Sequence, residues 1–218
     1  MLSSVQRTIE SVARGLGRDL SGAELGALVA YAELVRAWNA RVNLTAARTD
    51  EALAEVLFAD ALVLAGEELV PRGARIVDVG SGAGAPVVPL LVLRPDLHAT
   101  LVEPLRKRVA FLRIAIGTLE LADRARVLEA RVDPERPTVA GGPFDLALSR
   151  ATLAPETWAA TGLALAPRVA VLTAAEPVVV APESLVHLDR AYRLPLTGSP
   201  RRATVLGRND VDGGEPRV

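Results

Sequence analysis

The first seventy residues carry apolar side chains at the spacing of amphipathic helices. One such stripe consists of Val5, Ile9, Val12 and Leu16. Ser21 followed by Glu24 forms a capping box, which indicates the start of a second helix. A third helical pattern starts near Asp50 and ends around Gly66. We therefore predict an N-terminal helical cap over residues 1–70.

After Pro71 the pattern changes to short β-rich runs that alternate with helical segments. The predicted strands are "ARIVDVG", "HATLVEP", "ARVLEA", "PFDLALSRA" and "RVAVLTA", and the last two runs, "LVHLDRAYRLP" and "RATVLGR", suit an antiparallel pair. This alternation predicts an α/β sheet, mostly parallel with an antiparallel last strand, over residues 71–208. Residues 209–218 are predicted to form a flexible tail. No linker separates the helices from the sheet, so we expect the cap to pack on it.

Composition narrows the possible chemistry. Half of the 218 residues are hydrophobic, which allows a large core. The sequence has no cysteine, which excludes a disulfide scaffold, a thiolate nucleophile and a cysteine zinc site. With 25 basic and 26 acidic residues, the overall charge gives no sign of nucleic-acid binding. No signal peptide or membrane-length apolar run is visible, so we expect a cytoplasmic protein, and a monomer.

The stretch "RIVDVGSGAGAP" predicts a ligand site. An apolar strand runs through Asp78 and is followed by Gly80, Gly82 and Gly84 before a helical segment. A glycine-rich turn lets the backbone approach a ligand closely, and the helix that follows supplies free N–H groups. The spacing matches neither a phosphate-binding P-loop nor the full dinucleotide fingerprint. The alternative is a tight turn with no ligand.

Polar residues follow the predicted strands at one edge of the sheet. Glu103 ends the strand after the glycine loop, where a carboxylate can accept hydrogen bonds from both ribose hydroxyls of a nucleoside cofactor. Asp133 and Arg150 are expected at the ends of the next two strands. The alternative for Glu103 is an ordinary surface glutamate. Ligands of open α/β sheets bind beyond the carboxyl ends of the strands, so these residues predict one site.

These residues also carry a resemblance to a known family. "VDVGSGAGAP" resembles the first motif of class I S-adenosylmethionine methyltransferases. The segments "WNARVNLTA", "RPDLHATLVEPLRKRVAFLR", "SRA" and "YRLP" occur in the order and spacing of the bacterial 16S ribosomal RNA guanine-N7 methyltransferases, the GidB family. The similarity covers roughly residues 25 to 206.

The resemblance implies a fold, a cofactor and a reaction. The fold would be a Rossmann-like class I methyltransferase sheet, and S-adenosyl-L-methionine would lie across the glycine loop. The implied cofactor-binding residues are Asp78, Gly80, Gly82, Gly84, Ala85, Glu103, Val132, Asp133 and Arg150. The methyl group would go to a guanine N7 of 16S ribosomal RNA, free or in the small ribosomal subunit. That nitrogen has a free lone pair, so the resemblance implies no catalytic base, and it implies no metal.

The sequence departs from the family pattern at several positions. Ala85 and Val87 replace an aromatic residue and a glycine, while Leu57 and Ala61 replace a histidine and a serine around the retained Asp60. A lysine–glycine pair expected after the fifth strand is also missing. These changes leave two alternatives open: a divergent methyltransferase acting on a small molecule, or a non-enzymatic relative that binds the cofactor.

Three further features have both a functional and a structural interpretation. Lys107, Arg108 and Arg202 are predicted to bind the RNA substrate, with Arg106 and Arg201 as further candidates. For the cluster from Arg106 to Arg108, a solvated surface is the simpler interpretation. Asp60 lies on an apolar helix face, where it needs a partner such as an arginine. Trp38 could line a nucleotide pocket, but packing between cap and sheet is the expected role.

Overall fold

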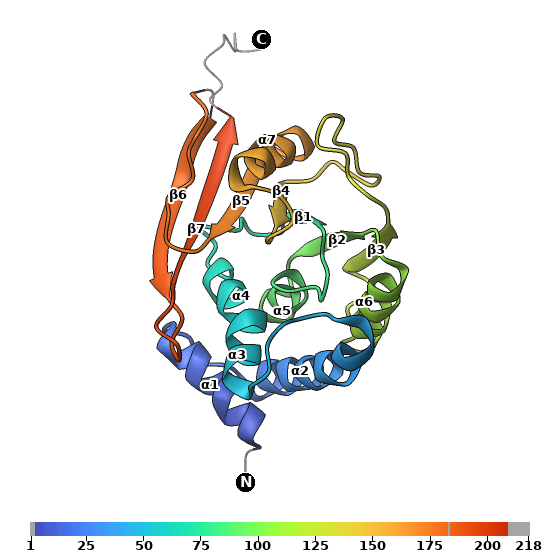
Figure 1. Ribbon diagram of the computed structural model, residues 1–218, viewed down its shortest axis with the longest axis vertical. Helices are drawn as coiled ribbons and strands as arrows, with labels where there is room; N and C mark the ends of the chain where they lie inside the picture. The colour runs from blue at the N-terminus through green and yellow to red at the C-terminus, as the bar shows by residue number, and fades with distance from the viewer. Residues whose placement is uncertain (1–2, 183, 209–218) are drawn as a thin grey trace.

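A seven-stranded sheet forms the centre of the protein, as seen in a computed structural model that describes residues 3–182 and 184–208 (Figure 1). The strands are β1 (Arg75–Val79), β2 (His98–Glu103), β3 (Ala125–Glu129), β4 (Leu146–Ser149), β5 (Arg168–Thr173), β6 (Ser184–Arg193) and β7 (Pro200–Arg208). Their order in the sheet is β3-β2-β1-β4-β5-β7-β6. The first five pair in parallel, and β7 is antiparallel to both β5 and β6. The predicted α/β sheet is confirmed.

Three helices connect the parallel strands. They are α5 (Val87–Leu93), α6 (Arg106–Thr118) and α7 (Pro155–Leu165). α5 is buried almost all round, whereas α6 and α7 each bury one apolar face. In α7 the indole N–H of Trp158 also donates to the carbonyl of Ala170 at 2.9 Å. After β1 the chain places β2 and then β3 on one side of β1, and it later places β4 on the other side of β1. Such a reversal of strand order leaves a crevice above β1 and β4.

The N-terminal helices include the capping box that the sequence predicts. They are α1 (Ser4–Gly15), α2 (Gly22–Val42), α3 (Asp50–Ala54), the π-helical turn η1 (Glu55–Ala59) and α4 (Asp60–Leu64). Ser21 and Glu24 form a reciprocal capping box at the start of α2. The segments α3, η1 and α4 follow one another without a break, so the third predicted helix contains a π-helical turn.

The N-terminal helices share one apolar core with the sheet. This core includes Ile9, Tyr31, Phe58, Leu64, Ile76, Leu90 and Leu101. The opposite face of the sheet has a second apolar cluster, built from Val77, Trp158, Val169 and Leu206 among others. Trp38 packs edge-on against Phe111, with ring centroids 5.9 Å apart, as expected for a residue between cap and sheet. In Figure 1 the helices α1 to α4 lie together below the sheet, and the β6–β7 hairpin runs along one side.

Within the two described ranges, no helix has both the length and the apolar character needed to cross a membrane. The tail predicted for residues 209–218 lies outside the described residues.

Candidate functional site

A cleft of about 1120 Å³ opens beyond the carboxyl ends of the parallel strands. Its floor is formed by the loops after β1, β2, β4 and β5, and its other sides by the N-terminal helices and the β6–β7 hairpin. Sites for a single drug-sized ligand usually measure about 300–1,000 Å³. The cleft therefore has room for one ligand and for part of a second.

The glycine loop after β1 presents bare backbone to this cleft. Gly82 has a φ of +56°, and a Cβ placed on it would have no atom closer than 3.8 Å, so the space beside it is open. Gly84 has a φ of +87°, but there a Cβ would lie 2.6 Å from Val88 Cγ2 and 2.9 Å from Leu112 Cδ2. The two glycines thus have different roles: Gly84 permits close packing, whereas Gly82 leaves the backbone open to a ligand.

Glu103 lies at the end of β2, where the sequence predicts it, and contacts the loop directly. Its Oε2 accepts the N–H of Gly82 at 2.9 Å, and its Oε1 accepts the N–H of Leu105 at 2.9 Å. The side chain lines the cleft although the residue is only 2% exposed. Because each carboxylate oxygen has a second lone pair, Glu103 both holds the loop and can accept hydrogen bonds from a ligand.

Asp78 lies beneath the glycine loop and does not line the cleft. Its Oδ2 has no hydrogen-bond partner among the described residues. Burial raises the pKa of Asp78 to about 7, against smaller opposing effects of Ser81 and Arg150. Asp78 is therefore a buried carboxyl group near the end of β1, adjacent to the glycine loop but outside the cleft.

Arg150 follows β4 and ties the strand end to the N-terminal helices. Its Nη1 donates to Asp60 Oδ2 at 3.0 Å and to the carbonyl of Val56 at 2.5 Å. The hydroxyl of Tyr192, on β6, donates to the other oxygen of Asp60. Asp60 therefore has the arginine partner that its apolar surroundings require. Burial raises the pKa of Tyr192, and the nearby charge of Asp60 raises it further. This network joins three segments around one end of the cleft.

Two residues that sequence reasoning missed hold the cleft together. The buried hydroxyl of Tyr31, on α2, donates to the carbonyl of Ala83 in the glycine loop at 2.5 Å. Glu55 is 3% exposed, and its Oε1 accepts the N–H groups of Leu196 at 2.6 Å and Thr197 at 3.0 Å in the turn before β7. The available signal in the sequence was a polar side chain, Tyr31 or Glu55, on an otherwise apolar helix face. Such a pattern does not indicate which group the side chain bonds to.

The structure brings some predicted site residues to the cleft and not others. Those that line it are Gly80, Gly82, Ala85, Glu103, Arg108 and Arg150. Those that do not are Asp78, Gly84, Val132, Asp133, Lys107 and Arg202. The strand β3 ends at Glu129, so Asp133 lies four residues later in a loop, exposed, with its Oδ1 accepting the N–H of Glu135 at 3.0 Å. Arg131 lines the cleft in that region instead.

The predicted basic residues also differ in their surroundings. Lys107 is exposed at the start of α6, whereas Arg108 donates to the carbonyl of Asn43 at 3.2 Å and lines the cleft. Arg202 pairs with Asp189 on β6. Its neighbour Arg201, the other candidate from the closing strands, lines the cleft.

The sequence was compared with protein families and with individual proteins. The model of the family described as "GidB: rRNA small subunit methyltransferase G" matches residues 24–171. A ribosomal RNA small subunit methyltransferase G from Anaeromyxobacter dehalogenans is 36% identical over 156 residues, which is 70% of this chain and 71% of the relative. The protein of the same name from Geobacter sp. is 31% identical over an alignment that covers 96% of this chain and 100% of the relative.

Solved structures are similar in fold. A protein of the NADB-Rossmann superfamily from Streptococcus agalactiae superposes with a TM-score of 0.52 and 13% identity, covering 71% of this chain and 69% of that one. A putative methyltransferase, yhhF from Escherichia coli, superposes with a TM-score of 0.50 and 18% identity, covering 67% and 82%. These likenesses support the Rossmann-like fold, and the family match covers both the glycine loop and Glu103. The chain therefore belongs to the GidB family, the family of rRNA small subunit methyltransferase G, and is a methyltransferase with a Rossmann-like sheet.

Proposed function

We propose that the protein transfers the methyl group of S-adenosyl-L-methionine to a guanine N7 of 16S ribosomal RNA. The observation that carries this proposal is the open backbone at Gly82 beside the buried carboxylate of Glu103, in a chain that matches the GidB family over residues 24–171. The relatives' printed names support the small-subunit RNA as substrate.

The residues around the cleft fit a nucleoside cofactor. Glu103 has free lone pairs for two ribose hydroxyls, and Gly82 leaves space where a ligand can approach the main chain. Gly80, Ala85 and Arg150 line the same cleft and are proposed as further contacts. Asp78 and Gly84 act from beneath the loop, while Val132 and Asp133 would contribute through the loop after β3. When bound, S-adenosyl-L-methionine supplies an electrophilic methyl group on its sulfonium.

The protein's own task in this reaction is to position the guanine. The N7 nitrogen carries a lone pair and no proton, so the side chains need not remove one. Rate acceleration then comes from holding the base in line with the methyl group and from solvating the changing charges. This fits a cleft whose charged groups, such as Arg150 with Asp60, are fixed by pairing.

Among the departures from the family pattern, Ala85 lines the cleft and is 6% exposed, so the aromatic side chain that it replaces is missing from the cleft surface. Ala61 and Val87 are fully buried, and neither lines the cleft. Leu57 does line it, but is only 1% exposed. Lys107, Arg108 and Arg202 remain proposed RNA contacts, and of these three Arg108 lines the cleft together with the glycine loop.

Methyl transfer from tritiated cofactor tests the proposal. The substrates are small ribosomal subunits and naked 16S RNA from a strain that lacks the modification, compared with fully modified subunits as control. We expect incorporation of about one methyl group per unmodified RNA and none into the modified control. No incorporation into either unmodified substrate, with cofactor binding confirmed by calorimetry, would reject the RNA function.

A further inference from the structure

We propose that the β6–β7 hairpin forms the RNA-binding side of the cleft and that Arg201 contacts a phosphate of the substrate RNA. This inference rests on the proposed function and names a substrate contact within the same site. The sequence offers both Arg201 and Arg202 as candidates, and the register of the hairpin directs Arg201 to the cleft.

The first argument is the pairing of the charged groups that line the cleft. These groups are Arg108, Arg131, Arg150 and Arg201, together with Glu55, Asp60 and Glu103. Arg150 pairs with Asp60, and Glu55 and Glu103 accept backbone N–H groups. Arg108 donates to the carbonyl of Asn43, and, like Arg131, it forms no ion pair among the described residues, but both lie on the β2–β3 side of the cleft. Arg201 donates only to the carbonyl of its neighbour Pro200, at 3.1 Å, and no carboxylate pairs with it among the described residues. Its guanidinium therefore keeps most of its donors for a ligand.

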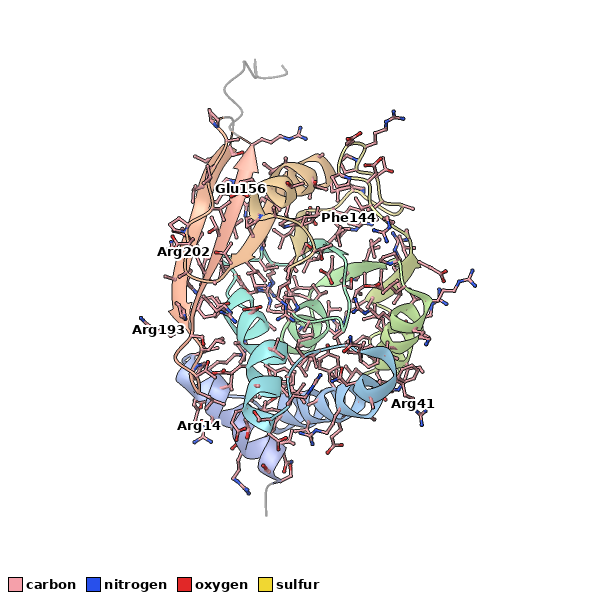
Figure 2. All side chains as sticks on the ribbon, viewed as in Figure 1. Arg14, Arg41, Phe144, Glu156, Arg193 and Arg202 are labelled. Atoms are coloured by element: carbon pink, nitrogen blue, oxygen red, sulfur yellow. The ribbon has the colours of Figure 1, made fainter. Side chains whose placement is uncertain are left out.

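The second argument is the direction in which Arg201 points. Arg201 lies opposite Tyr192 in the β6–β7 register, and the hydroxyl of Tyr192 reaches Asp60 at the cleft. Residues that face each other across a strand pair share one face of the sheet, and successive residues alternate between faces. Arg202 consequently points the other way, where it pairs with Asp189. In Figure 2 Arg193 and Arg202 are labelled beside the β6–β7 hairpin; Arg202 Nε also donates to the carbonyl of Ala175, after β5, at 3.3 Å.

The third argument is distance from the ribose-binding side. In the sheet, β1, β4 and β5 lie between β2, which carries Glu103, and β7, which carries Arg201. Four strand spacings amount to roughly 19 Å. A residue so far from Glu103 is poorly placed to contact the nucleoside of the cofactor and well placed to contact a second, larger ligand.

The fourth argument is that the hairpin is held in place. Glu55 holds the turn between β6 and β7 by accepting the N–H groups of Leu196 and Thr197. An exposed ion pair of 2.8 Å between Arg190, on β6, and Glu68, after α4, adds a second contact. Arg201 is thus presented by a supported segment. The ligand is expected to be a phosphate because a guanidinium offers a planar pair of donors that matches phosphate oxygens. Thr197 and Ser199 line the same side and add neutral donors.

The test compares Arg201→Ala with Arg193→Ala, which removes the same charge from the outer side of the same hairpin. We expect Arg201→Ala to raise the KM for unmodified small subunits about tenfold, the scale for one charge-assisted hydrogen bond, while the affinity for S-adenosylhomocysteine stays unchanged. Each phosphate contact contributes about 0.7 to 0.9 to the slope of log affinity against log salt concentration, so that slope should fall by about this amount. Arg201→Lys keeps the charge and should keep the slope. Arg193→Ala should behave as wild type.

The outcomes separate this inference from the proposed function. If the wild type methylates the RNA but Arg201→Ala matches Arg193→Ala in KM and salt slope, Arg201 is not a phosphate contact. If Arg201→Ala weakens binding of S-adenosylhomocysteine, Arg201 belongs to the cofactor site and the inference is overturned. Failure of the wild type to methylate unmodified RNA, by contrast, rejects the proposed function itself.

Discussion

Arg150 and Asp60 are ninety residues apart in sequence, yet they form an ion pair of 3.0 Å at the edge of the cleft. The pair connects the end of β4 to the start of α4, and Tyr192 extends it to β6. Because Arg150 also donates to the carbonyl of Val56, this one guanidinium contacts both η1 and α4 from the end of β4. A site residue predicted for cofactor binding thus also determines where the helices lie.

Replacing Asp60 with alanine should destabilise the protein strongly. The Asp60 and Arg150 side chains are 8% and 25% exposed, and removing one partner of a largely buried pair costs about 3 kcal/mol or more. The free energy of unfolding in urea, followed by circular dichroism, measures the loss. The matched control is Glu10→Ala, which breaks the exposed Arg14–Glu10 pair on α1 and should cost about 0.3–0.5 kcal/mol. Equal losses in the two variants would contradict the structural role of Asp60.

Replacing Glu103 with alanine should weaken cofactor binding by about 1.5–3 kcal/mol, the range for hydrogen bonds to a charged group. The change removes an acceptor proposed for the ribose and releases the N–H groups of Gly82 and Leu105. Calorimetric titration with S-adenosylmethionine and S-adenosylhomocysteine measures the effect. Glu129→Ala serves as control, because Glu129 lies beside Glu103 in the sheet but pairs with Arg106 outside the cleft. An unchanged dissociation constant for Glu103→Ala would exclude it as the ribose acceptor.

Gly82→Ala should separate backbone strain from ligand binding. Gly82 and Gly73 both have positive φ, +56° and +70°, and a Cβ on either meets no close atom. Alanine at each position should therefore lose about 1–2 kcal/mol of stability. Only Gly82→Ala fills space beside the proposed cofactor, so only it should weaken cofactor binding, by about tenfold or more. Similar binding by both variants would show that Gly82 does not face the ligand.

Asp78 should make the stability of the protein depend on pH. Burial raises its folded-state pKa from 3.8 to about 7, so the folded protein keeps a proton that the unfolded chain releases. The free energy of unfolding should consequently fall as the pH rises from about 4 to about 7, and then level off. Asp78→Asn lacks this ionisation, so its stability relative to wild type should increase across that window. Urea midpoints near pH 5 and near pH 8 measure the difference.

The other shifted carboxyl groups do not interfere with that comparison. Hydrogen bonds lower the pKa values of Glu24, Glu68 and Asp96, so their effect on stability ends near the unfolded values of 4.5 and 3.8. Wild type and Asp78→Asn share these groups, so their contributions cancel in the difference. Parallel stability curves for wild type and Asp78→Asn would show that the proton on Asp78 does not contribute.

The sequence by itself determined the alternation of strands and helices, the glycine loop and the position of Glu103. Each of these depends on local rules: periods of 2 and 3.6 in apolar residues, turn chemistry after Asp78, and the meeting of parallel strand ends at one edge. The central strands β1, β2 and β4 are buried on both faces, and α6 is buried on one face, so their patterns are strong.

Only the tertiary structure decided which polar groups share the cleft. Arg201 and Arg202 are neighbours in sequence, but the β6–β7 register turns Arg201 toward the cleft and Arg202 toward Asp189. Glu55 and Tyr31 meet backbone groups that lie far away along the chain, and Asp133 lies beyond the last paired residue of β3. No local pattern encodes these partners, because a strand pair fixes its register, and a helix its neighbours, only when the whole core packs.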